Sequence, residues 1–185
     1  MEALKSAEEK TKLVEMEILG VKYVYDPLYD RTVEVYGCAG ENPFAKDKQY
    51  IGGWPNPMKI GRKYAKKGEF STAHILAHNL GGTDESINLF VQKTMENIKK
   101  NKPYQLAEKE MRKDDTRSFD IVLSYDGGNH GLTDIPSRIT YMIYKKDKEE
   151  PRVFEIDNPP SELPGELVAK YKAYLENKLN LEVRR

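Results

Sequence analysis

The first third of the chain contains short apolar segments separated by polar turns. Residues 2–15 are rich in Glu, Lys and Ala and carry apolar side chains at spacings of three and four, which predicts a short amphipathic helix. Two strand-like segments follow at 21–25 and 32–36, and the Asp and Pro residues at 26–30 suit a turn between them. We therefore expect an antiparallel hairpin here, followed by a loop-like stretch over residues 37–69.

The middle of the chain changes from strand-like to helical spacing. Residues 70–77 are apolar enough for a strand, and Leu80-Gly81-Gly82-Thr83-Asp84 breaks it with residues that permit a positive φ. A helical pattern begins at Asn88 and continues to Met111 past Asn101-Lys102-Pro103, which divides or kinks it. The pattern predicts a strand, a glycine turn and one or two helices.

The last third alternates again and ends in a helix. Residues 118–125 and 138–144 alternate apolar and polar side chains, which predicts a second hairpin with a long loop. Residues 152–156 are expected to add an edge strand that the Pro159-Pro160 pair ends. Residues 165–179 close the chain as a helix, and its apolar stripe is expected to pack on the rest of the protein. The stripe consists of Leu167, Val168, Tyr171, Tyr174, Leu175 and Leu179.

These elements predict an α+β fold with an antiparallel sheet, flanking helices and a C-terminal helix. A length of 185 residues suits one domain with a modest appendage. We expect an N-terminal helical arm over residues 1–20, the main domain over 21–160, and a C-terminal helix over 161–185 that packs on this domain.

Composition excludes several classes of protein. Lys plus Arg equals Asp plus Glu at 30 each, so any affinity for nucleic acid must come from local patches. Cys38 is the single cysteine, which rules out a disulfide or a thiolate zinc site within one chain, and we expect it to be buried. The chain has no apolar run near the ~18 residues that span a bilayer and no signal-peptide pattern at its start, so we expect a soluble protein that does not contact membranes.

One segment carries candidate chemistry, with His74 on the strand, Gly81-Gly82 in the turn and Asn97 on the following helix. Hydrolysis of a phosphodiester needs an activated water, and a neutral imidazole can accept the water's proton at physiological pH. It also needs charge neutralisation, which Mg²⁺ held by hard oxygen ligands such as an Asn side chain supplies. The chain between His74 and Asn97 is long enough for both side chains to face one cleft.

At these residues the sequence resembles the DNA/RNA non-specific endonucleases of the ββα-metal (His-Me finger) superfamily, above all the nuclease domains that end bacterial polymorphic toxins. The likeness covers roughly residues 70–160 and implies a ββα-metal nuclease core. It also implies cleavage of DNA, with RNA as a further candidate substrate, that depends on Mg²⁺ or alternatively Mn²⁺. The motifs that carry it are His74-Ile75-Leu76-Ala77, Leu80-Gly81-Gly82, Asp84, Asn88-Leu89-Phe90, Gln92, Asn97, Tyr104 and Glu108.

The resemblance also implies roles for individual residues. It makes His74 the general base, Asn97 the Mg²⁺ ligand, Glu108 an acid that orients metal-bound waters, and Asn88 a structural residue that pins the turn. Asn101 is the alternative ligand, because its spacing from Glu108 is nearly that of the family. Measured from Asn88, Asn97 fits better and is preferred.

Substrate contacts are expected from basic residues on both sides of the motif. A solvated surface is the alternative interpretation of the basic cluster that precedes it. The resemblance further implies a cognate immunity protein as partner and, for a toxin domain, secretion by a specialised system and action in the cytoplasm of the target cell. The substrate-binding candidates are Arg62, Lys63, Lys66, Lys67, Lys93 and Tyr104, of which Tyr104 would stack on a sugar or base.

The motif departs from the family before its histidine. The better known form has Asp-Arg-Gly there, whereas this chain has Ser71-Thr72-Ala73, which predicts lower activity or a substitute such as Arg62. His78 would share a strand face with His74 and could join it at zinc, although a third ligand is not evident. His130 is expected to be a loop residue.

Two other classes of protein remain as alternatives. An HNH-type nuclease of narrower specificity shares the histidine, the Gly-Gly turn and a metal ligand on the helix. It would need an Asp beside the first histidine and a further histidine ligand on the helix, and the sequence has neither. A non-catalytic binding or immunity-type protein is favoured by the zero net charge.

Overall fold

A six-stranded antiparallel sheet with the strand order β1-β2-β3-β6-β7-β8 forms the framework of the protein. The computed structural model describes residues 12–38, 69–93, 102–126, 129–158 and 162–183. The strands of this sheet are β1 (Val14–Ile18), β2 (Val21–Asp26), β3 (Arg31–Cys38), β6 (Thr116–Ser124), β7 (Arg138–Lys145) and β8 (Arg152–Asp157).

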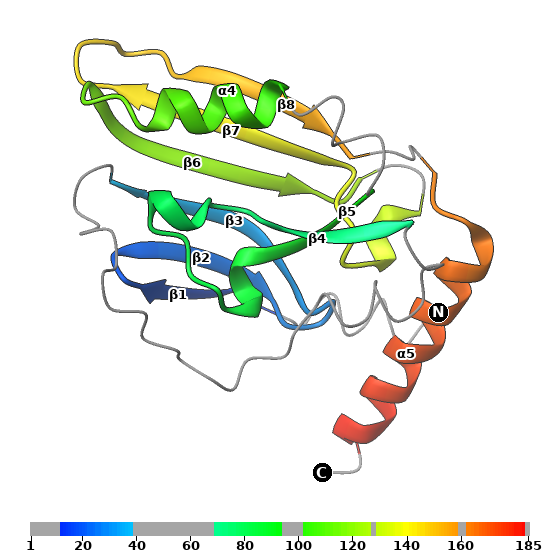
Figure 1. The fold of residues 1–185 in the computed structure, drawn as a ribbon. Helices are drawn as coiled ribbons and strands as arrows, with labels where there is room; N and C mark the ends of the chain where they lie inside the picture. The colour runs from blue at the N-terminus through cyan, green and yellow to red at the C-terminus, as the bar shows by residue number, and fades with distance from the viewer. Residues whose placement is uncertain (1–11, 39–68, 94–101, 127–128, 159–161, 184–185) are drawn as a thin grey trace.

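A short hairpin and a helix lie on one face of this sheet (Figure 1). The hairpin consists of β4 (Phe70–His74) and β5 (Leu89–Lys93), and the helix is α4 (Lys102–Met111). The hairpin packs over β2 and β3, whereas α4 packs over β6, β7 and β8. The helix is the next described element after the hairpin in the chain. The hairpin and the helix lie side by side on the same face of the sheet.

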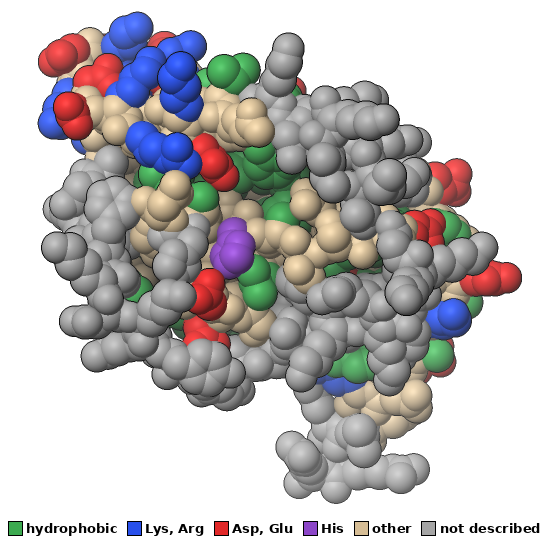
Figure 2. All heavy atoms as spheres, in the orientation of Figure 1, with side chains coloured by type: hydrophobic (Ala, Val, Ile, Leu, Met, Phe, Trp, Pro, Cys, Tyr) green, Lys and Arg blue, Asp and Glu red, His purple; other side chains and the backbone are tan. Residues whose placement is uncertain are grey.

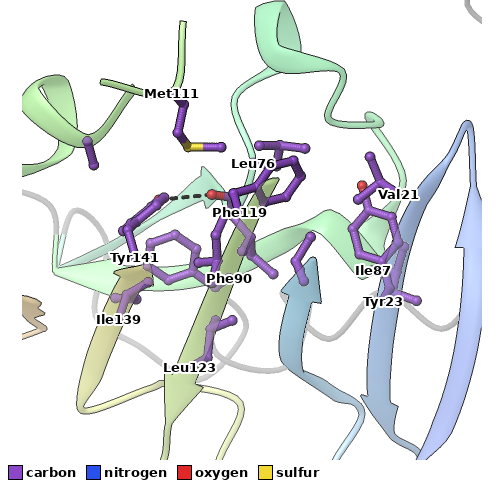
Figure 3. Packing of buried hydrophobic residues seen from close by; sticks show 14 of the residues in the cluster. Val21, Tyr23, Leu76, Ile87, Phe90, Met111, Phe119, Leu123, Ile139 and Tyr141 are labelled. Atoms are coloured by element: carbon purple, nitrogen blue, oxygen red, sulfur yellow. Dashed lines mark hydrogen bonds between the residues drawn. The ribbon is translucent and has the colours of Figure 1, made fainter. Parts of the chain in front are cut away.

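The main core lies between the sheet and these two elements because side chains alternate across each strand. Tyr23, Val35, Ile121 and Tyr141 are paired from strand to strand and form one buried row across four strands. From the other side the hairpin and α4 add apolar side chains that include Leu76, Ile87, Phe90 and Met111 (Figure 3).

The C-terminal helix α5 (Gly165–Val183) packs at the far end of the molecule (Figure 1). Leu167, Val168 and Tyr171 join a second apolar cluster that includes Phe70 of β4, and Leu175 packs with the β2–β3 turn. Polar contacts add to this packing, since Asp30 in that turn accepts a hydrogen bond from Tyr174 at 2.7 Å and pairs with Lys178 at 2.7 Å. The apolar stripe predicted for this helix is confirmed.

Both predicted hairpins and the predicted edge strand are confirmed. β2 pairs antiparallel with β3, β6 pairs antiparallel with β7, and β8 lies at the edge of the sheet. The α+β class and the antiparallel sheet are confirmed as well. Among the described residues, no helix has the length and apolar character needed to cross a membrane.

The helix predicted over residues 2–15 is wrong at its end, because Val14 begins β1. β1 pairs with β2, and the turn between them consists of Leu19 and Gly20. Both residues have a positive φ, at 53° and 76°. Two such residues in succession form the tight turn that suits a hairpin. Residues 1–11 of the predicted arm lie outside the described part of the chain, and the proposed domain boundaries stay a prediction.

Three other expectations for the first half need correction. The helix predicted from Asn88 is wrong over Leu89–Lys93, which is strand β5, whereas the predicted helical segment after Pro103 is confirmed as α4. The strand predicted over residues 70–77 ends at His74. Cys38 is exposed rather than buried, because it is the last residue of β3.

Candidate active site

His74 lies at the end of β4, where the strand leaves the hairpin ladder. It pairs with Leu89 of β5, and its side chain is 39 % exposed. Its Nε2 lies 3.3 Å from Oδ1 of Asp84, a carboxylate on the other side of the Gly-Gly turn. Figure 2 shows a histidine at the surface between acidic side chains, with Lys and Arg side chains beyond one of them.

The contact with Asp84 has a chemical consequence for the imidazole. A carboxylate accepts a hydrogen bond from Nε2 when that nitrogen carries the proton. The other ring nitrogen, Nδ1, then has a free lone pair and can take a proton from a bound molecule. An exposed histidine held in this way is suited to act as a general base.

The loop after His74 is closed by Asn88, which is fully buried. Its Oδ1 accepts a hydrogen bond from the N–H of Leu76 at 2.9 Å, and its Nδ2 donates to the carbonyl oxygens of Leu76 at 2.9 Å and Thr83 at 2.8 Å. The role that the family resemblance implied for Asn88, to pin the turn, is therefore confirmed.

The glycine pair in this loop is required by two different constraints. Gly81 has a φ of 94°, which L side chains rarely adopt. At Gly82 a Cβ atom would lie 1.9 Å from the carbonyl oxygen of Leu76 and 2.6 Å from Nδ2 of Asn88. The loop can therefore approach its own start this closely only because Gly82 has no side chain.

Two side chains of the large sheet, and a third just after its last strand, bond to the backbone of the hairpin segment. Thr32 Oγ1 donates to the carbonyl of Ile87 at 2.5 Å, and Asn158 Nδ2 donates to that of Val91 at 2.9 Å. The hydroxyl of Tyr141 donates to the carbonyl of Ile75, the residue after His74, at 2.9 Å. These bonds fix the hairpin, and with it the backbone of His74, on the sheet.

Glu108 and Tyr104 both lie on α4 and are partly buried. The carboxylate of Glu108 is 32 % exposed and pairs with Arg112 at 3.2 Å. The ring of Tyr104 is stacked on Phe90 and contacts Tyr141 edge-on, with centroids 6.3 Å and 5.9 Å apart. Burial raises the pKa of Tyr104 well above its usual value, and the neighbouring Tyr141 and Glu108 add to the effect. Tyr104 therefore contributes to the core, and its contact with substrate stays a prediction.

The remaining histidines differ from His74. His78 lies in the 3-10 turn η1 (His78–Leu80), not on a strand, so the argument that placed it on the same strand face as His74 does not hold. His130 begins the 3-10 turn η3 (His130–Leu132), is fully buried, and its Nδ1 lies 2.8 Å from the carbonyl oxygen of Ile135. Its surroundings are those of a structural residue.

Of the remaining candidate residues, only Lys93 lies in the described part of the chain. It is the last residue of β5 and pairs with Phe70. Within the ranges that the structure describes, no three His, Cys, Asp or Glu side chains are grouped so as to hold a metal ion. The carboxylates of Asp84 and Glu108 are hard oxygen donors of the kind that Mg²⁺ prefers. Outside the described residues lie Asn97, Asn101, Arg62, Lys63, Lys66 and Lys67.

Comparison with known proteins gives only distant similarities. No family model matches the sequence, and no curated protein matches it. The chain is similar to the Sda1 nuclease with a bound zinc ion, with 14 % identity and a TM-score of 0.49 over 80 % of this chain and 84 % of that one.

It is also similar to NucA from Streptococcus agalactiae. The form with no metal bound shows 11 % identity and a TM-score of 0.49 over 85 % of this chain and 89 % of that one. The form with magnesium bound shows 12 % identity and a TM-score of 0.42 over 86 % and 88 %. Likenesses at this level establish neither a shared fold nor a shared activity.

Two residues near His74 make contacts that the sequence did not predict. Asp84 belongs to the quoted motif, but its contact with His74 depends on how the Gly-Gly turn folds back. Tyr141 is far from the motif in sequence and reaches Ile75 from the buried face of β7. The sequence signal for Tyr141 is limited to the alternating pattern of its strand, which predicts that its side chain is buried.

Proposed function

We propose that this chain is a metal-dependent endonuclease with a ββα-metal core that hydrolyses the phosphodiester bonds of DNA, with RNA as a further candidate substrate. One observation carries the proposal. An exposed histidine ends the first strand of a hairpin whose turn is closed by Gly82 and Asn88, and the next described element is α4. This order of strand, strand and helix places a proton acceptor in an accessible position on a rigid support.

His74 acts as the general base in this proposal. Asp84 holds Nε2 of the imidazole at 3.3 Å, so that Nδ1 receives the proton of the attacking water. The rigid hairpin matters because a general base must stay within hydrogen-bond reach of the proton that it removes. The hydrogen bond between Tyr141 and Ile75 and the one between Asn88 and Leu76 supply that rigidity.

The metal site of the proposal rests on the family resemblance. Asn97, or alternatively Asn101, would hold Mg²⁺ or Mn²⁺, and Glu108 would orient its waters. The bound ion would neutralise charge on the phosphate and stabilise the leaving oxygen. The exposed carboxylates of Asp84 and Glu108 are compatible with a cation nearby.

The biological setting is proposed on the same ground. We assign the chain to the bacterial antagonistic toxins, with a cognate immunity protein as its partner and the cytoplasm of a target cell as its place of action. Contacts with substrate are assigned to basic residues on both sides of the histidine motif, which would bind phosphates, and to Tyr104, which would stack on a sugar or base. These are Arg62, Lys63, Lys66, Lys67, Lys93 and Tyr104.

A cleavage assay with matched variants tests the proposal. Plasmid DNA and a folded RNA are incubated with wild type, His74→Ala, Asn97→Ala and Asn101→Ala, in Mg²⁺, in Mn²⁺ or in EDTA. Wild type should cut and EDTA should stop it, while His74→Ala should lose at least about a hundredfold in rate. The matched control is Asn79→Ala, an exposed residue of the hairpin loop, which should keep its rate.

The two asparagine variants decide between the proposed ligands. The true ligand should show a loss of rate that a higher Mg²⁺ concentration partly restores, because its replacement weakens the binding of metal. Wild type that leaves both DNA and RNA intact in either metal would overturn the proposal. Stoichiometric binding of a partner without turnover would then favour the non-catalytic alternative.

A further inference from the structure

The hydroxyl of Tyr141 connects strand β7 of the large sheet to the backbone beside His74. Tyr141 lies on β7 between Ile121 of β6 and Phe154 of β8 and is 2 % exposed. Its hydroxyl donates a hydrogen bond of 2.9 Å to the carbonyl of Ile75. Figure 3 shows this bond reaching from the sheet up to the hairpin segment. The contact joins residues that are far apart in sequence.

This hydrogen bond supplies a donor to the backbone carbonyl of Ile75. The N–H of Ile75 donates to the carbonyl of Asn88 at 2.7 Å, and both polar groups of Leu76 bond to the Asn88 side chain. Ile75 is 1 % exposed, and its carbonyl oxygen accepts a hydrogen bond from the hydroxyl of Tyr141. A buried carbonyl without a donor is costly, so the hydrogen bond from Tyr141 holds the Ile75–Leu76 peptide in place.

The side chain of Tyr141 is in turn held by α4. The ring of Tyr104 meets that of Tyr141 edge-on, with an interplanar angle of 81°. Glu108 is on the same helix as Tyr104, one turn further along. Any shift of α4 against the sheet therefore changes the packing of Tyr141, and through its hydroxyl the position of the backbone that carries His74.

We propose that Tyr141 is a positioning residue of the active site, which aligns His74 with the groups on α4 through its hydrogen bond to Ile75. The proposal rests on the proposed function of His74 as general base. It differs from a role in stability alone because it predicts an effect on the imidazole that an equally buried tyrosine elsewhere does not have.

The test compares Tyr141→Phe with Tyr125→Phe. Tyr125 is a matched control, since its hydroxyl also donates to a buried backbone carbonyl, that of Thr32, at 2.8 Å. Both variants remove one hydroxyl and keep the ring. Each is assayed at a temperature at which circular dichroism shows the variant to be folded, so that a loss of stability does not enter the rate.

Two readouts are taken on the full chain. The first is kcat and KM for plasmid cleavage, where Tyr141→Phe should lower kcat about tenfold with KM unchanged, whereas Tyr125→Phe should stay within about twofold of wild type. The second is the NMR chemical shift of the His74 imidazole, assigned with His74→Ala. Tyr141→Phe should change this chemical shift, and Tyr125→Phe should leave it unchanged.

The NMR readout separates this proposal from the proposed function. An unchanged His74 signal in Tyr141→Phe, or an equal shift in Tyr125→Phe, would overturn the positioning role whether or not the chain cuts DNA. An equal loss of kcat in both variants would overturn it too. A wild type without cleavage, or a His74→Ala variant with full activity, would instead overturn the proposed function.

Discussion

The side chain of Asn88 bonds to both the N–H and the carbonyl of Leu76, each at 2.9 Å. Leu76 lies two residues after His74, and a third bond from Asn88 reaches Thr83 on the other side of the glycine turn. One buried amide thus closes the loop at both ends. The position of His74 depends on this closure, because β4 ends at that residue.

Replacement of Asn88 should therefore destabilise the whole protein. Asn88→Ala leaves one donor and two acceptors unpaired in a buried place, and we expect the free energy of unfolding to fall by about 2–4 kcal/mol. Urea denaturation followed by circular dichroism measures this change. Asn79→Ala, at an exposed position of the same loop, should stay within about 0.5 kcal/mol of wild type. A loss below about 1 kcal/mol at Asn88 would argue against its role in closing the loop.

The glycine turn gives a second prediction with its own control. In Gly82→Ala the new Cβ would lie 1.9 Å from a backbone oxygen of Leu76, so the loop must open. We expect a loss of about 3 kcal/mol or more in the free energy of unfolding. Gly165→Ala, where the new Cβ would meet no atom within 4 Å beyond its chain neighbours and the backbone of its own helix, should be nearly neutral. Equal stability of the two variants would contradict the close approach at Gly82.

A buried charge cluster joins the end of α4 to the sheet and should control stability in acid. Lys145 Nζ lies 2.9 Å from Glu110 and 2.8 Å from Asp115, and Arg152 lies 2.7 Å from Glu110. Burial raises the pKa of Glu110, but hydrogen bonds from Lys113, Lys145 and Arg152 outweigh it and lower the pKa to about 2. The stabilisation is thus present above the ordinary value of 4.5 and is lost as the pH falls toward 2.

Glu110→Gln tests this cluster. At pH 7 the variant should lose about 3–5 kcal/mol, because Lys145 keeps its charge in a buried place without that partner. Between pH 6 and pH 3 its stability should fall less steeply than that of wild type. Urea midpoints measured across this range provide the comparison, and parallel curves for the two proteins would show that Glu110 does not titrate as described.

Asp120 should destabilise the protein at neutral pH. It lies on β6 beside Glu34 of β3, and burial raises its pKa to about 6, with the charge of Glu34 and a hydrogen bond to it adding to the rise. A folded pKa above the ordinary value of 3.8 means that the stabilisation present below pH 3.8 is lost as the pH rises through about 6.

Asp120→Asn should therefore be more stable than wild type at pH 7.5. We expect a gain of about 1 kcal/mol, less than the full shift in pKa would give, because water screens this half-buried group. The gain should disappear below pH 4. Asp114→Asn, at an exposed position, serves as the control and should show no gain. A gain that is the same at pH 4 and pH 7.5 would contradict the assignment.

The sequence predicted the parts of this structure that depend on local pattern. Residues 118–125 and 138–144 alternate regularly, and they form β6 and β7. The helical spacing of apolar residues over 89–93 predicts a helix, but pairing with β4 buries Phe90 and Val91 and makes a strand. Pairing with a neighbouring strand outweighs local periodicity in such a short segment.

The same distinction holds at the candidate site. His74 and Gly82 were predicted because they belong to one continuous motif, and the close approach at Gly82 explains why that motif needs glycine. The contacts of Asp84 with His74 and of Tyr141 with Ile75 were not predicted. They depend on how the turn folds back and on how the hairpin segment is placed over the sheet, and neither is encoded in the spacing of residues along the chain.

Chemical rescue of His74→Gly is the most direct test of the central claim that His74 is the general base of an endonuclease. The variant, shown to be folded by circular dichroism, is assayed for plasmid cleavage with Mg²⁺ at increasing imidazole concentration, with Asn79→Ala as a control. We predict a loss of at least about a hundredfold without imidazole, and a recovery that rises with the concentration of neutral imidazole. A His74→Gly variant that cuts at the wild-type rate, or whose loss imidazole does not relieve, would contradict the claim.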